Sequence, residues 1–96
     1  MTEGKPLSDR AIRHALWRLV RQAREYRPRH DETDVKPAVD KRTGYYLHAW
    51  YDLRCRWHAR ISTGDNVPLT PHGEGREYRQ ALAELWLQCA EKLGVN

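Results

Sequence analysis

The chain has 96 residues, and its formal net charge is +4 because seventeen lysines and arginines outnumber thirteen acidic residues. This length predicts a single domain over residues 1–96, with one small core and no room for a second module. No apolar run is long enough to span a membrane and the polar first residues lack the apolar segment of a secretion signal, so we expect a cytoplasmic protein that does not contact membranes, with frayed ends at 1–7 and 94–96.

The first predicted element is a helix that runs from about Ser8 or Asp9 to Arg27. Apolar residues recur there at three- and four-residue spacing, and Ser8 or Asp9 can accept hydrogen bonds from the free amides of the first turn. Pro28 ends the helix because proline cannot continue the helical hydrogen-bond pattern. The outer face is strongly cationic and carries Arg10, Arg13, His14, Trp17, Arg18, Arg21 and Arg24.

Residues 28–34 are expected to form a loop with an acidic patch, and a short strand is predicted over residues 35–39. Pro37 marks this strand as an edge strand, because a residue without an N–H cannot complete a central ladder. The following run from Asp40 to Gly44 ends on a glycine that can adopt a positive φ, which is typical of a hairpin turn.

The tract from Tyr45 to Ile61 decides the fold. Its odd positions are apolar, whereas its even positions are polar or aromatic, and this alternation is typical of a strand with one wet face. A straight strand of this length would span about 56 Å, so it must bend or break, for example at a bulge near Asp52. The same tract also places an apolar stripe on one side of a helix, and in that alternative the protein is a three-helix bundle.

Residues 62–74 are expected to form a loop, in which residues 66–69 could pair back as a third strand. The last predicted element is a helix from about Gly75 to Leu93, followed by Gly94 as a C-cap. Its apolar stripe consists of Tyr78, Leu82, Leu85, Trp86, Cys89 and Leu93. The preferred fold is therefore α+β, with the N-terminal and C-terminal helices packed on a small antiparallel sheet of two or three strands.

Two candidate binding surfaces follow from this fold. If both helices cover the odd face of the sheet, the even face displays arginines two residues apart, at a spacing of about 7 Å, beside aromatic rings that could stack on bases. The nucleic-acid surface predicted in this way consists of Tyr46, His48, Trp50, Arg54, Arg56, His58 and Arg60. The second surface is the cationic face of the first helix, which could contact phosphates or an acidic protein groove through Arg13, Arg21 and Arg24.

The sequence offers little for catalysis. It has no Gly-rich phosphate loop, nucleophile elbow or paired-carboxylate cluster, and Gly73-Glu74-Gly75 lacks the remaining glycines of a nucleotide fingerprint. An acid–base pair of His48 with Asp52, or of His58 with Asp65, would arise only through tertiary structure. We therefore expect a protein that is not an enzyme and has no cofactor.

The cysteines and histidines do not indicate a metal site. Cys55 and Cys89 both have apolar neighbours, so we expect them to be reduced thiols of the core, with one bridge between them as the alternative. The five histidines are scattered, without the close His or Cys pairs that hold a tetrahedral zinc ion.

The order of helix, short strands and helix is similar to that of double-stranded RNA-binding domains, in which a glycine-flanked basic start of the last helix meets phosphate. In this chain Gly73, Gly75, Arg76 and Arg79 stand in the comparable place. The doubled lysines of that family are absent, so the resemblance covers element order and this one stretch, and the family's function is not carried over.

The sequence thus favours a small, non-enzymatic binding module. The preferred interpretation is a nucleic-acid-binding or regulatory protein that uses the arginine and aromatic face of the sheet. The alternative is a protein-binding inhibitor or adaptor of the kind encoded by phages and mobile elements, whose hot spots would be exposed tryptophan and arginine residues. The expected partner is nucleic acid or an acidic protein surface, and a homodimer is a further option for so small a core.

Overall fold

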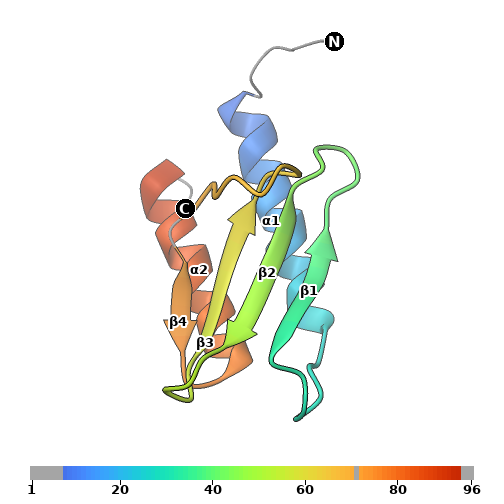
Figure 1. The fold of residues 1–96 in the computed structure, drawn as a ribbon. Coiled ribbons are helices and arrows are strands. Elements are labelled where there is room, and N and C mark those ends of the chain that lie inside the picture. The colour runs from blue at the N-terminus through green and yellow to red at the C-terminus, as the bar shows by residue number, and fades with distance from the viewer. Residues whose placement is uncertain (1–7, 71, 94–96) are drawn as a thin grey trace.

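The predicted α+β fold is confirmed by the computed structural model, which describes residues 8–70 and 72–93. In chain order the elements are α1 (Asp9–Glu25), β1 (Asp34–Val39), β2 (Tyr46–Tyr51), β3 (Trp57–Ser62), β4 (Gly73–Gly75) and α2 (Tyr78–Leu93). The strands form one antiparallel sheet in the order β1-β2-β3-β4, and both helices lie on the same face of it (Figure 1). The sheet has one strand more than predicted, and the three-helix alternative is wrong. The ends predicted to be frayed, 1–7 and 94–96, lie outside the described residues.

Helix α1 begins where the sequence predicts and ends two residues earlier. The hydroxyl of Ser8 accepts a hydrogen bond from the amide of Ala11 at 3.1 Å, which caps the first turn. At the other end Tyr26 is already extended, with φ −80° and ψ 141°. Because a proline disfavours helical geometry in the residue before it, the chain leaves the helix ahead of Pro28. The apolar stripe of α1 is buried and includes Leu16, Leu19, Val20 and Ala23.

The central tract is extended, as predicted, but it is broken into a hairpin rather than bent at a bulge. Strands β2 and β3 pair antiparallel, with Leu47 opposite Ile61 and Ala49 opposite Ala59. These four odd-numbered residues are fully buried. The even-numbered residues between them point to the other face of the sheet, because successive side chains alternate along a strand. The predicted alternation is therefore confirmed in both strands.

The turn between β2 and β3 is built around one carboxylate. Asp52 accepts hydrogen bonds from the amides of Arg54 at 2.9 Å and Arg56 at 3.1 Å. Cys55 has φ 64°, the left-handed conformation that a three-residue hairpin loop needs at its last position and that glycine usually supplies. Cys55 is exposed in this turn, so the prediction that it belongs to the core is wrong. Cys89 is buried, and burial raises the pKa of its thiol to about 11.

The hairpin between β1 and β2 forms at the predicted turn, where Gly44 has φ 80°. Strand β1 is an edge strand, as Pro37 indicates, and it begins at Asp34, one residue earlier than predicted. Its pairing with β2 shifts register between Val35 and Ala38, next to the proline. The bulged, proline-containing edge is poorly suited to pairing with a strand of another chain.

A mostly buried ion pair ties this hairpin to α1. The Asp40 carboxylate is only 7% exposed and accepts two hydrogen bonds from the Arg18 guanidinium, at 3.1 and 3.0 Å. These hydrogen bonds from Arg18 hold the pKa of Asp40 below its ordinary value, so the carboxylate stays ionised near neutral pH. The prediction that Arg18 belongs to the free cationic face is therefore wrong, because its guanidinium is paired with the Asp40 carboxylate.

Strand β4 lies directly against α2, and two glycines allow this close approach. A Cβ atom on Gly73 would lie 2.3 Å from the backbone nitrogen of Leu85 and 2.4 Å from the carbonyl oxygen of Ala81. A Cβ atom on Gly75 would lie 2.5 Å from the Cβ of Gln80. The Gly-Glu-Gly motif therefore serves packing between a strand and a helix. Residues 73 and 74, predicted as loop, belong to β4, and the helix predicted from residue 75 begins at residue 78.

Tyr78 closes the core at the start of α2. Its hydroxyl donates a hydrogen bond to the carbonyl of Ala23 at 2.7 Å, and its ring packs edge-on against Tyr26 and Trp57. The described part of the predicted α2 stripe is buried or partly buried.

Residues 66–69 do not form the suggested third strand; they contribute one isolated bridge, between Pro68 and Ser62. Within residues 8–70 and 72–93, no helix combines the length and the apolar character needed to cross a bilayer.

Candidate functional site

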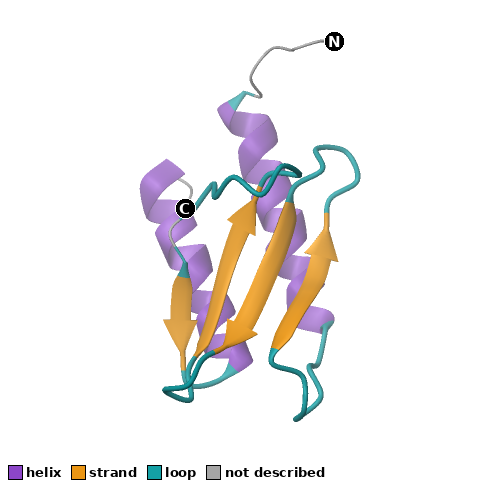
Figure 2. Cartoon of the chain, viewed as in Figure 1, coloured by secondary structure: helices purple, strands orange, loops and turns teal. Residues whose placement is uncertain are grey.

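One face of the sheet is left uncovered by the helices (Figure 2). We call it the open face, and its side chains from the four strands and the adjoining segment are Asp34, Lys36, Tyr46, His48, Trp50, His58, Arg60, His72 and Glu74. Five of the predicted nucleic-acid contacts, Tyr46, His48, Trp50, His58 and Arg60, are brought together here. Arg54 and Arg56 are not in a strand, because the chain turns at residues 52–56. The predicted row of strand arginines is therefore reduced to Arg60.

Aromatic and imidazole rings pack against one another at the centre of the open face. His58 stacks on Trp50, with ring centres 5.2 Å apart and an angle of 10° between the planes. His48 lies 5.0 Å from the same indole, and the guanidinium carbon of Arg60 lies 5.4 Å from its centre. The ring of His72 lies 5.9 Å from the indole as well, so Trp50 is contacted by four side chains of its own protein. It offers less free ring surface to a nucleobase than an unpartnered tryptophan would.

Both carboxylates of the open face, Asp34 and Glu74, are paired with basic side chains. Nε2 of His48 lies 2.8 Å from Asp34, and Arg56 donates to Glu74 at 2.6 Å. Nε2 of His58 lies 2.5 Å from Asp52, so the acid–base pairs suggested by the sequence, His48 with Asp52 and His58 with Asp65, do not form. Asp34 and Glu74 balance Lys36 and Arg60 in formal charge, so the open face is not a strongly basic surface.

Asp52 holds His58 in a defined tautomer. The hydrogen bond from His58, together with the backbone amides of Arg56 and Arg54, lowers the pKa of Asp52 below its ordinary value. An ionised carboxylate can only accept a hydrogen bond, so Nε2 of His58 carries the proton. In the neutral ring Nδ1 is then a bare acceptor, and this buried atom has no hydrogen-bond partner among the described residues.

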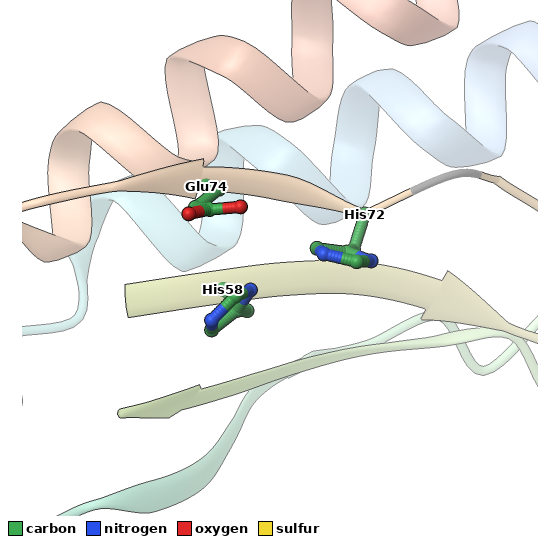
Figure 3. Close-up of side chains that lie close together, drawn as sticks. All are labelled: His58, His72 and Glu74. Carbon is green, nitrogen blue, oxygen red and sulfur yellow. The ribbon is translucent and has the colours of Figure 1, made fainter. Parts of the chain in front are cut away.

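Three potential metal ligands meet at one edge of the open face (Figure 3). Glu74 is the middle residue of β4, and His72 directly precedes that strand. Glu74 stands directly opposite His58 on β3. One ligand atom from each of the three residues lies within 4.8 Å of the other two. The spacing of histidines and cysteines along the sequence does not reveal this cluster, because its members come from neighbouring strands whose pairing only the fold shows.

The other candidate surface is a groove between the two helices, with a volume of about 620 Å³. We call it the helix groove, and it is lined by Trp17, Val20, Arg21, Arg24, Arg79, Leu82, Ala83, Trp86 and Leu87. Two of the predicted contacts, Arg21 and Arg24, lie in it, whereas Arg13 does not. The contribution of α2 was not anticipated, although its residues 79, 82, 83, 86 and 87 repeat at helical spacing along one edge of the apolar stripe, which itself includes Leu82 and Trp86.

The helix groove combines exposed apolar side chains with free positive charge. Trp17 is 49% exposed and Leu87 is 63% exposed, and both line the same groove. The Arg21 guanidinium lies 5.1 Å from the centre of the Trp17 ring. Within residues 8–70 and 72–93, none of the three arginines that line the groove forms an ion pair.

The resemblance to double-stranded RNA-binding domains does not extend to this site. Gly73 and Gly75 pack β4 onto α2. Arg79 lines the helix groove, whereas Arg76 lies in a separate shallow pocket beside Tyr51 and Trp57. Comparison of the chain with protein-family models, with curated proteins and with solved structures gives no match.

Proposed function

We propose that this protein is a non-enzymatic binding module that holds an acidic, amphipathic helix of a partner protein in the helix groove. The observation that carries the proposal is the pairing of an apolar floor with a rim of free arginines in one concave site. Exposed tryptophan and arginine side chains dominate the binding energy of protein interfaces. A groove between two helices is also a common receptor for the apolar face of a third helix.

The composition of the groove favours a protein partner over nucleic acid. Six of its nine lining residues are apolar, and four of these are aliphatic side chains that offer no stacking surface to a base. Along α1 the site extends from Trp17 to Arg24, which is about 11 Å of helix axis, or two turns. A short amphipathic helix with leucine-type anchors and acidic flanks matches this length and this charge.

Nucleic acid is the second candidate partner, favoured by one specific observation. The exposed side chains of Arg10, Arg21 and Arg24 lie on α1 without an ion pair in the part of the chain that the structure describes. A helix with such a row can lie along a phosphate backbone, and binding of that kind would weaken steeply with added salt.

The test is a selection of helical peptides from a randomised display library, with the full chain as bait. We expect selected peptides to be acidic, with apolar residues three and four apart. Leu87→Ala should weaken their binding about tenfold, because it removes an exposed apolar anchor. Leu53→Ala is the matched control, since Leu53 is fully exposed at the tip of the β2–β3 turn.

Three results would contradict the proposal. The first is a set of selected peptides without an acidic bias. The second is equal affinity of these peptides for Leu87→Ala and for the unmodified protein. The third is a single-stranded oligonucleotide that, titrated in parallel, binds more tightly than every selected peptide. A homodimer that Leu87→Ala dissociates would also assign the groove to a second copy of this chain instead.

A further inference from the structure

We propose that His58, His72 and Glu74 bind one divalent transition-metal ion, with zinc as the first candidate, on the face of the protein opposite the helix groove. The three residues supply two imidazole nitrogens and one carboxylate oxygen, and these atoms already lie within 4.8 Å of one another. The site is independent of the helix groove, so neither proposal depends on the other.

The state of His58 is the main support for this site. Its side chain is buried, and Nδ1 has no hydrogen-bond partner among the described residues. A buried imidazole nitrogen without a partner is unfavourable, because the group has lost its contact with water and gained nothing in exchange. A metal ion bound at Nδ1 would supply the missing interaction.

Asp52 completes an arrangement that is typical of metal-binding histidines. A histidine that ligates a metal usually donates its other N–H to a carboxylate, which fixes the ring and makes the ligand more basic. Nε2 of His58 donates to Asp52, and Asp52 is itself fixed by the amides of Arg54 and Arg56. The ligand is therefore oriented by the rigid turn between β2 and β3.

The ligand set determines the kind of metal. Two imidazoles with one carboxylate suit zinc and similar transition metals, whereas magnesium and calcium prefer sites made of oxygen atoms alone. Three protein ligands leave at least one position for water, as in zinc sites that are not purely structural. Arg56 donates its hydrogen bond to Oε2 of Glu74, so Oε1 can serve as the metal ligand.

A modest movement of side chains would bring the ligands to bonding distance. Zinc bonds of about 2.0 to 2.1 Å place neighbouring ligand atoms of a tetrahedral site roughly 3.4 Å apart. His72 and Glu74 are exposed and can move inward by the remaining distance, whereas His58 is fixed between Trp50 and Asp52. His72 and Glu74 would thus move toward His58, which is already held in place.

The experiment is a calorimetric titration of the metal-free chain of residues 1–96 with Zn²⁺. We expect one ion per chain, and we expect His72→Ala and Glu74→Gln each to weaken binding by about tenfold or more. Asp52→Asn should also weaken binding, by roughly 10- to 100-fold, because it removes the carboxylate that orients His58. His14→Ala is the matched control, since His14 is an exposed histidine of α1, and it should leave the affinity unchanged.

Because His72 and Glu74 are exposed, their substitution should leave the melting temperature of the metal-free protein unchanged, so weaker zinc binding can be attributed to the site. The proposal is overturned if the unmodified protein binds less than one zinc ion per chain. It is also overturned if His72→Ala and Glu74→Gln bind zinc like the unmodified protein, or if His14→Ala weakens binding as much as they do.

Discussion

Replacing Gly73 by alanine is expected to lower the free energy of unfolding by about 3 kcal/mol, the upper end of the usual range for overpacking. The new methyl group would meet the backbone of α2 at Leu85 and Ala81, and a helix backbone cannot move aside as a flexible side chain can. For a domain of this size the loss corresponds to a fall in melting temperature of roughly 15 °C. Thermal unfolding followed by circular dichroism would measure it.

Two further glycines provide a graded control for this prediction. A methyl group on Gly75 would meet the Cβ of Gln80 at 2.5 Å but backbone atoms of α2 only at 3.0 Å, so Gly75→Ala should be less destabilising than Gly73→Ala. A methyl group on Gly64 would approach only the carbonyl oxygen of Gly44 in a neighbouring turn, at 3.3 Å, and Gly64→Ala should change stability by less than about 1 kcal/mol. Equal melting temperatures for all three variants would show that β4 does not pack on α2 as described.

Reversing two charges at the rim of the helix groove is expected to abolish most partner binding. In Arg21→Glu/Arg24→Glu, two attractive contacts with an acidic helix become repulsive, and we expect the affinity for the selected peptides to fall about 100-fold. Both arginines are exposed on α1, so the fold should survive the exchange. Calorimetry with one selected peptide would measure the affinity, and thermal unfolding would confirm that the variant is folded.

The matched control is Arg42→Glu/Arg54→Glu. It changes the net charge by the same amount, at two exposed arginines that lie in the hairpin turns outside the groove. If only the overall positive charge attracts the peptide, the two double variants will lose affinity equally. The helix-groove proposal requires a much larger loss for Arg21→Glu/Arg24→Glu, and an equal loss would refute it.

The helices and the alternation of the central tract could be predicted from the sequence because their signals are local. A capping serine, apolar residues at helical spacing and a following proline define α1, and alternating apolar positions define the buried face of β2 and β3. The hairpin at residue 52 was harder to recognise. Its left-handed position is occupied by Cys55 instead of glycine, and the apolar alternation continues through the turn.

The candidate sites depend on contacts between distant segments, which is why the sequence predicted them only in part. The free arginines of α1 were evident, but the groove also needs Trp86 and Leu87 from α2. Similarly, His72 and Glu74 come close to His58 only because a three-residue strand packs at the edge of the sheet. A strand so short, with glycine at both ends, has almost no pattern of its own.

The four tryptophans provide the most direct test of where a partner binds. Trp17 and Trp86 line the helix groove, Trp50 lies on the open face, and Trp57 packs against Tyr78. Each indole N–H gives a separate signal in a ¹H–¹⁵N NMR spectrum, so one titration with a selected acidic peptide reports on all these places at once. We expect the signals of Trp17 and Trp86 to shift while those of Trp50 and Trp57 stay in place. A shift of Trp50 with Trp17 and Trp86 unchanged would place binding on the sheet and contradict the proposed function.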